Sequence, residues 1–293
     1  MKKKYYHYTS LSCLFSIITT QELWLCNLKN SNDPNEFYLS CNDYNDYVKS
    51  TGLNPYNGRP YILPNNSIYG NTYGLSFTTL GDNLSHWERY GDLLRGVSIL
   101  FDVDSLQKEL KHRYNFSFNF DSIKYTESEK IAFIKKNLDK IDFIPQCSRA
   151  RKNLEALYFI EYFNQSQMLF KKSMFRSERE YMLYFDPTYF EFFYKFITTL
   201  NGDLFNDIIK DISVQFENLK HTLKLLNTDK HYAIMKNGIN SYLALNLCLI
   251  DKSKFIKEII LGPKCPQDIC ELQNFLHDHG YDIPISKSTV ELR

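Results

Sequence analysis

Two glutamates separated by one residue are the main candidates for catalytic chemistry in this sequence. They occur in Arg176-Ser177-Glu178-Arg179-Glu180-Tyr181, where a loop is predicted to enter a strand. Alternation along a strand would project both carboxylates the same way, about 7 Å apart. Two like charges on one face repel, and sheets normally avoid such a pair unless cations or a function compensate the repulsion. Arg176 and Arg179 are the nearest cations in the sequence. Two interpretations follow: a surface ion network, or carboxylates that stabilise an oxocarbenium-like ribose and orient its acceptor.

An imidazole lies near the start of the chain, in Tyr6-His7-Tyr8-Thr9. On a strand, His7 points to the opposite face from Tyr6 and Tyr8. It is then either a satisfied core or edge residue, or a neutral ring that bonds a hydroxyl such as that of a ribose.

Two further groups could contact a ligand. Gly74 in Tyr73-Gly74-Leu75-Ser76-Phe77-Thr78-Thr79 allows a close backbone approach, and Ser76 and Thr78 share one strand face. In the segment 86–92, Trp87 and Tyr90 are i, i+3 neighbours on a short helix. Their rings either anchor that helix to the core or pack on a planar ligand.

Basic side chains gather just upstream of the glutamates. They are Arg149, Arg151, Lys152, Lys171 and Lys172. Such a group could clamp a pyrophosphate or a nucleic-acid backbone, or it is a solvated face. A nucleic-acid-processing or nucleotide-sensing protein, with exposed aromatic rings for single-strand stacking, is therefore an alternative to an enzyme.

Short strands and helices are predicted to position these groups. Strands are expected at residues 4–9, 23–26, 73–79, 96–102, 180–185, 241–249, 256–261 and 283–286, and helices at about 10–20, 83–90, 131–141, 149–170 and 266–279. In addition, Asn32-Asp33-Pro34-Asn35-Glu36 is a helix-start signal. The pattern predicts an α+β protein with mixed strands.

The middle of the chain is predicted to be mainly helical. We expect a single domain over residues 1–293, with a helical insertion at roughly 121–230 interrupted by the strand at 180–185. A long helix over 204–226 carries an apolar stripe from Phe205 to Leu226. That stripe is core, a packing seam, or a surface for a partner or a second copy, which would suit a non-enzymatic interaction module.

Composition limits the class of protein. The chain has 293 residues with 35 Lys plus Arg against 34 Asp plus Glu, so a bulk polyanion binder is not expected. No Cys-x-x-Cys pair suggests a zinc site, so no metal is predicted. No apolar segment follows Lys2 to Lys4, and no run reaches the roughly 18 apolar residues that span a bilayer. We therefore expect no membrane association and a cytoplasmic location.

These pieces together resemble an uncharacterised bacterial family of unknown function. The resemblance rests on the Tyr-His-Tyr-Thr opening, the Asn-Asp-Pro-x-Glu turn, Ser76-Phe77, the Trp-x-x-Tyr helix, Gly96 to Asp102, Lys171 to Glu180, Ile259 to Pro263 and Lys287-Ser288. Where members of that family often carry an Arg, this sequence has Met182.

A more distant likeness is to ADP-ribosyltransferases. His7, Ser76-Phe77-Thr78 and Glu178-Arg179-Glu180 occur in the order of their motifs. The resemblance implies a mostly antiparallel split sheet that binds NAD. It implies that His7 holds a ribose hydroxyl, Ser76 braces the cleft, Glu180 bonds the nicotinamide-ribose 2′-OH and Glu178 positions the acceptor. Trp87 or Tyr90 would stack on nicotinamide, and the remaining candidates for contact with NAD are Tyr8, Thr78 and Arg176.

The leading hypothesis from this likeness is an NAD-consuming enzyme. It would be an ADP-ribosyltransferase acting on a protein or nucleic-acid acceptor, or an NAD glycohydrolase if water is the acceptor. NAD is then a substrate, and the reaction needs no metal. Bacterial proteins of this likeness often act as toxins or phage-defence effectors, and we extend the hypothesis that far.

Overall fold

The described part of the chain is built around one large, mostly antiparallel sheet. A computed structural model describes residues 3–28, 72–114, 118–142, 167–185, 230–235, 238–247 and 255–292. The strands are β1 (Tyr5–Thr9), β2 (Glu22–Asn27), β3 (Tyr73–Thr78), β4 (Val97–Phe101), β5 (Asn119–Ser122), β6 (Glu180–Phe185), β7 (Lys230–Met235), β8 (Gly238–Asn246), β9 (Ile256–Leu261) and β10 (Ile285–Lys287). They follow the order β10-β9-β4-β1-β3-β2-β8-β7, with β6 and β5 attached to β3.

The sheet branches at β3. Along one edge β3 pairs with β6 over its whole length, from Tyr73 to Thr78. Along the other edge β1 pairs with β3 at Thr78, and β2 pairs with it at Tyr73 and Gly74. Two arms of the sheet therefore leave opposite ends of one strand edge, and the middle of that edge is open between them.

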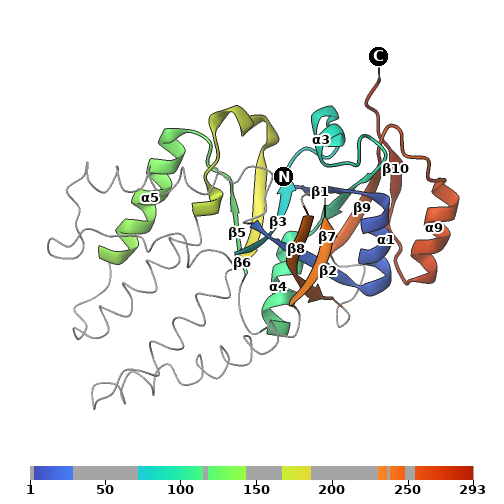
Figure 1. The fold of residues 1–293 in the computed structure, drawn as a ribbon, viewed down its shortest axis with the longest axis horizontal. Coiled ribbons are helices and arrows are strands. Elements are labelled where there is room, and N and C mark those ends of the chain that lie inside the picture. Colours follow the sequence, from blue (N-terminus) through green and yellow to red (C-terminus); the bar gives the residue numbers. More distant parts are fainter. Residues whose placement is uncertain are drawn as a thin grey trace, which may run out of the picture.

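The helices of the described part lie beside the sheet. They are α1 (Leu11–Thr20), α3 (Leu84–Arg89), α4 (Val103–Tyr114), α5 (Glu127–Asp142) and α9 (Ile269–Asp278), with 3-10 turns η2 (Gln167–Leu169) and η3 (Ser173–Glu178). Figure 1 shows α1 and α9 on one flank and α5 at the far end. Side-chain caps begin α1 at Ser10, α3 at Asn83 and α9 at Asp268, because each accepts a bond from an otherwise unsatisfied helical N–H.

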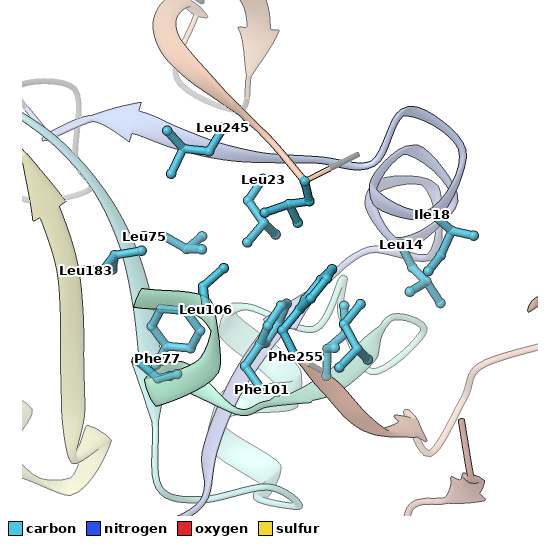
Figure 2. Close-up of a cluster of buried hydrophobic side chains, with 14 of the residues drawn as sticks. Leu14, Ile18, Leu23, Leu75, Phe77, Phe101, Leu106, Leu183, Leu245 and Phe255 are labelled. Atoms are coloured by element: carbon cyan, nitrogen blue, oxygen red, sulfur yellow. The ribbon is translucent and has the colours of Figure 1, made fainter. Parts of the chain in front are cut away.

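Both arms of the sheet close over one hydrophobic core. Leu75 and Phe77 of β3, Leu183 of β6 and Leu106 of α4 meet there with Leu245 of β8 (Figure 2). Helix α4 contributes Val103, Leu106 and Leu110, which repeat at helical spacing and are almost fully buried. Strands of both arms, including Ile99 of β4 and Leu245 of β8, therefore share this one core.

Two smaller apolar clusters cover the opposite face. One joins Met182 and Tyr184 of β6 to Tyr125 in the segment after β5, Leu169 of η2 and Phe133 of α5. The other packs Tyr6 and Tyr8 of β1 against Trp87 of α3 and residues of β4 and β9. The candidate site described below lies on this face, between the two clusters.

Most predicted strands are confirmed, with ends shifted by a few residues, and the fold is a mixed α/β arrangement. The prediction missed α4, β5 and β7. It was wrong at 167–170, where a 3-10 turn and an isolated bridge from Phe170 to Lys124 replace the expected end of a helix. The Asn32 to Glu36 turn, the helix at 204–226 and most of the predicted insertion lie outside the described residues.

Candidate functional site

The two glutamates lie buried where η3 runs into β6. Glu178 is the last residue of η3 and Glu180 is the first of β6. Between them Arg179 takes a left-handed conformation, with φ 46° and ψ 47°. The strand alternation that predicted a common direction therefore does not apply to Glu178. Instead, the left-handed turn brings both side chains into the protein, where the residues are 6% and 8% exposed.

Glu178 is held by two donors from α3 and its end. Arg89 Nη1 donates to Oε1 at 2.9 Å, and the Tyr90 hydroxyl donates to the same oxygen at 3.0 Å. Tyr90 is the C-cap of α3, with φ −121°, so the chain has already left the helix there. In the described part of the molecule no donor contacts the second carboxylate oxygen of Glu178, which leaves that oxygen able to accept a proton.

Glu180 is paired with a different cation. Its Oε2 lies 2.7 Å from Lys171 Nζ, and both side chains are largely buried, at 10% and 13% exposed. This ion pair compensates the charge of the buried carboxylate oxygen. The backbone of Glu180 is fixed separately, because its N–H donates to the Tyr125 hydroxyl at 3.0 Å.

A histidine and a threonine hold the backbone between the carboxylates. The Glu178 carbonyl accepts a bond from Thr78 Oγ1 at 2.7 Å, and His86 Nε2 lies 3.2 Å from it. The other ring nitrogen of His86 lies 3.0 Å from Asn83 Oδ1, which also accepts the His86 backbone N–H as a helix cap. Both ring nitrogens therefore face acceptors, and a neutral ring satisfies only one of them.

Burial controls the protonation of this cluster. Burial raises the pKa of Tyr90 and Tyr125, and the charges of Glu178 and Glu180 raise both further. Burial lowers the pKa of His86, although the Glu178 carbonyl and the two carboxylates oppose that shift. The shared influence of the two glutamates on three neighbours indicates that they form one electrostatic centre.

His7 does not join this centre. Its Nδ1 donates to the Ser76 carbonyl at 2.8 Å, on the open part of the β3 edge, and its ring lies 6.1 Å from that of Phe77. Strand alternation puts His7 on the face of Tyr5 and the main core, whereas Glu180 faces the cluster of Met182 and Tyr184. The expected meeting of His7 with the glutamates is therefore not formed, because the sheet lies between them.

Three other predicted ligand contacts are structural in this arrangement. Trp87 is fully buried, and its Nε1 donates to Asp82 at 2.7 Å, so the ring anchors α3 and has no exposed face for nicotinamide. Tyr8 is 6% exposed and its hydroxyl joins Leu80 O to Asn83 N. Thr78 is buried against the Glu178 carbonyl. Of the predicted contacts, Tyr90 reaches the glutamates, while Ser76 is exposed on β3.

The cations that neutralise the glutamates differ from those expected. Arg176 lies 3.8 Å from Glu129 and is 65% exposed, and Arg179 is exposed. Arg89 and Lys171 take their place. Of the predicted basic group, Arg149, Arg151 and Lys152 lie outside the described residues.

Four residues of the centre were absent from the predicted site. His86 and Arg89 stand in the same short segment as Trp87 and Tyr90, and Lys171 stands in the basic group, so their sequence signals were present but were not joined to the glutamates. Tyr125 had no local signal, because only the pairing of β5 with β6 brings it to Glu180.

The described residues contain neither a metal-binding cluster nor a membrane-spanning helix. No group of three or more His, Cys, Asp or Glu side chains within them is arranged to hold a metal ion. Within the same ranges, no helix has the length and apolar character needed to cross a membrane.

The fold and the site define a class: an α/β protein with a branched, mostly antiparallel sheet and two buried, cation-paired carboxylates at the head of an internal strand. Residues 86–181 match the model of a family described as a protein of unknown function (DUF2971). The match confirms the expected resemblance to an uncharacterised family and includes His86 to Arg89 of α3, Lys171 and both glutamates. Neither a curated protein nor a solved structure matches the chain significantly, and the likeness to ADP-ribosyltransferases is not confirmed.

Proposed function

We propose that this chain is an enzyme that consumes NAD by breaking its N-glycosidic bond. It acts as an ADP-ribosyltransferase, or as an NAD glycohydrolase when water is the acceptor. The observation that carries the proposal is the pair of buried carboxylates at the junction of η3 and β6, each beside a cation. A cationic ribose centre is stabilised by fixed negative charge in a site that excludes water.

The reaction uses the two carboxylates in different roles. Glu180 accepts a hydrogen bond from the 2′-OH of the nicotinamide ribose. The bond from C1′ to the nicotinamide nitrogen breaks, its electron pair leaves with neutral nicotinamide, and C1′ becomes cationic. The acceptor then forms a bond to C1′ and transfers its proton to the second oxygen of Glu178, the one that neither Arg89 nor Tyr90 contacts.

Substrate reaches this centre past two partly exposed side chains. The Arg89 side chain is 56% exposed although its guanidinium contacts buried Glu178, and Tyr90 is 39% exposed. Because most of the Arg89 side chain is exposed, its guanidinium can turn away from Glu178 when a bound substrate compensates the buried carboxylate, so Arg89 serves as the cover of the site. Once displaced, its charge remains close enough to pair with the phosphates of the substrate.

The architecture supports the proposal in part. The branch at β3 and the two arms around one core are in keeping with the split sheet expected from the ADP-ribosyltransferase resemblance. The position of His7 does not agree with that resemblance, so in the proposed site no imidazole from β1 contacts the ribose. The proposal also includes a helical insertion into this sheet, within residues 121–230.

The direct test is release of nicotinamide from NAD. We expect the purified chain to release nicotinamide in buffer or in the presence of protein and nucleic-acid acceptors. Glu180→Gln should lower the rate by about 10²-fold or more, because removal of one preorganised charge-stabilising group typically costs that much. Glu178→Gln should mainly lower transfer to the acceptor, measured as labelled product.

Matched variants make this test specific. Glu271→Gln, at an exposed first-turn position of α9, should leave the rate unchanged. His7→Gln should retain turnover if it folds, because the sheet separates His7 from the carboxylates. Absence of nicotinamide release with every acceptor, or full activity in Glu180→Gln, would end the proposal.

Two earlier hypotheses remain predictions. The nucleic-acid or nucleotide-sensing hypothesis uses the basic group, most of which lies outside the described residues. The interaction module depends on the helix at 204–226, which also lies outside them. A role as a toxin or phage-defence effector would follow if the acceptor proves to be an essential cellular molecule.

A further inference from the structure

The His86 ring is buried beside the glutamates and takes no part in the proposed chemistry. His86 of α3 is 4% exposed, and its Nε2 lies 3.2 Å from the carbonyl oxygen of Glu178. Its Nδ1 lies 3.0 Å from Oδ1 of Asn83, the N-cap of α3. The ring therefore bridges the start of α3 and the backbone of the turn between the two carboxylates.

This bridge offers more acceptors than a neutral ring has protons. Asn83 Oδ1 also accepts the backbone N–H of His86 at 3.3 Å, so this atom of the amide is the oxygen. A neutral imidazole has one N–H and one lone pair, so in either tautomer one ring nitrogen directs its lone pair at an oxygen. A protonated ring donates to both oxygens. The bridge is therefore complete only when His86 carries a proton on each ring nitrogen.

The bridge acts on a residue that α3 also holds by its side chain. Arg89 and Tyr90, at the end of α3, donate to Glu178 Oε1. His86 faces the carbonyl of the same residue, which Thr78 Oγ1 also holds at 2.7 Å. Proton uptake by the ring strengthens the hold of α3 on this backbone. It also adds one positive charge to a centre in which each carboxylate is already paired with a cation.

The ring is surrounded by other ionisable groups. Burial lowers the pKa of His86 below its ordinary 6.5, as does Arg89, whereas the Glu178 carbonyl and both carboxylates raise it. Burial raises the pKa of Tyr8 and Tyr90, so both hydroxyls stay protonated when the imidazole titrates. In the described part of the molecule the ionisable groups that face the ring are Tyr8 of β1 and Tyr90, with ring centroids at 5.2 and 5.9 Å, Arg89 of α3, Glu178 of η3 and Glu180 of β6.

We propose that His86 is a positioning residue whose protonation switches the glutamate centre off. The protonated ring ties the Glu178 carbonyl to Asn83 and places a positive charge next to the carboxylates that stabilise the cationic ribose. Fixed positive charge opposes the development of positive charge at C1′, so the barrier rises. The effect on the reaction rests on the proposed function, whereas the change in the hold on the carbonyl does not.

The first test follows the Glu178 carbonyl by NMR without substrate. Its ¹³C shift, read through the Arg179 amide, should titrate with the same midpoint as the His86 ring, below pH 6.5. This step should be absent in His86→Gln. His277→Gln, which removes an exposed imidazole from α9, should leave the step unchanged. A Glu178 carbonyl that does not respond while the ring titrates overturns the inference.

A second variant changes the bridge without removing the ring. Asp caps a helix as well as Asn does, so Asn83→Asp should keep α3 intact. The variant also gives Nδ1 a charged acceptor, which favours the protonated ring. The midpoints of the ring and of the Glu178 carbonyl should therefore rise together by about one pH unit or more.

The second test measures nicotinamide release from NAD against pH. The kcat/KM should fall below the midpoint of the ring by about tenfold per pH unit, because it follows the protonation of the free enzyme. This fall should begin at a correspondingly higher pH in Asn83→Asp. It should be absent at the ring midpoint in His86→Gln and unchanged in His277→Gln.

The two tests separate this inference from the proposed function. If nicotinamide is released but Asn83→Asp raises the midpoint of the ring and leaves the pH profile in place, His86 does not control the centre and the proposed function survives. If the Glu178 carbonyl titrates with the ring but no nicotinamide is released at any pH, the coupling through His86 stands and the proposed NAD chemistry fails.

Discussion

At the scale of single residues, each glutamate of the centre is paired with a cation. Glu178 has Arg89 and Tyr90, and Glu180 has Lys171. Taking a charge out of water is costly, and removal of one member of a buried pair leaves the other uncompensated. The contacts that stabilise the site also fix the positions of two carboxylates close to the protein surface.

The Lys171 pair gives a stability prediction with a neighbouring control. Lys171→Met should lower the free energy of unfolding by about 3 kcal/mol at neutral pH, because Glu180 remains buried without its cation. Lys172→Met, at an exposed position, should change stability by less than about 0.5 kcal/mol. Urea unfolding at neutral pH measures both, and equal effects of the two variants would contradict the pairing.

His86 gives a pH prediction. Its folded pKa is lowered by burial below the ordinary 6.5, so the unfolded chain binds the proton more readily. The contribution of His86 to stability is therefore present above pH 6.5 and is lost as the pH falls from 6.5 toward the folded pKa. Thermal unfolding should show a smaller loss over that window in His86→Gln than in the unmodified chain.

His112, exposed on α4, provides the matched comparison for that experiment. His112→Gln should keep the pH dependence of the unmodified chain. NMR titration of the His86 ring should give a pKa below 6.5, and a value above 6.5 would show that the two acceptors and the two carboxylates outweigh burial.

At the scale of elements, helix α3 and the 3-10 turn η3 bring the charged groups together. Asp82 ties the loop before α3 to the C-terminal segment: it accepts bonds from Trp87 Nε1, Ser288 Oγ, Thr289 N and Thr289 Oγ1. Burial raises the pKa of Asp82, but these hydrogen bonds together lower it by more, so the net direction is downward. Its contribution to stability is present above pH 3.8 and is lost as the pH falls through the folded pKa.

Asp82→Asn should release the C-terminal segment from α3. Charge-assisted bonds become neutral and one acceptor oxygen becomes a donor, so we expect a loss of about 1–3 kcal/mol. Hydrogen exchange at the Thr289 amide should accelerate. Asp92→Asn, at an exposed position after α3, should leave that amide unchanged. If Thr289 stays protected in Asp82→Asn, the tie does not hold the segment.

At the scale of the whole molecule, the branch at β3 makes one core serve both arms of the sheet. Phe77 is 2% exposed at this branch and contacts the rings of Phe101 and Phe120. Loss of this side chain removes packing shared by β4, β5 and β3. The site on the other face then depends on the same core, because β3 and β6 carry Thr78 and Glu180 as a pair.

Phe77→Ala should lower the free energy of unfolding by about 3–5 kcal/mol through the cavity that it leaves. Met174→Ala, which shortens an exposed side chain, should change it by less than about 0.5 kcal/mol. Denaturant unfolding followed by fluorescence and by circular dichroism measures both. A large loss confined to one probe would show that the two arms do not share one core.

The sequence by itself determined the local elements and their chemistry. Apolar periodicity and capping residues located α1, α3, α9 and most strands, because these signals act within a few residues. They could not locate α4, whose apolar positions are few, or the left-handed turn at residues 92–94, where φ is 49°, 51° and 75° without any glycine. Those features depend on packing against distant strands.

Only the tertiary structure decided which residues share the site. Sequence order placed His7 with the glutamates, but one residue of alternation along β1 turns its ring to the opposite face of the sheet. Lys171, Arg89 and Tyr125 reach Glu178 and Glu180 through strand pairing and the ends of α3 and η3. The reason is physical: residue type sets what a side chain can do, whereas the face of the sheet and the partner across it depend on long-range pairing.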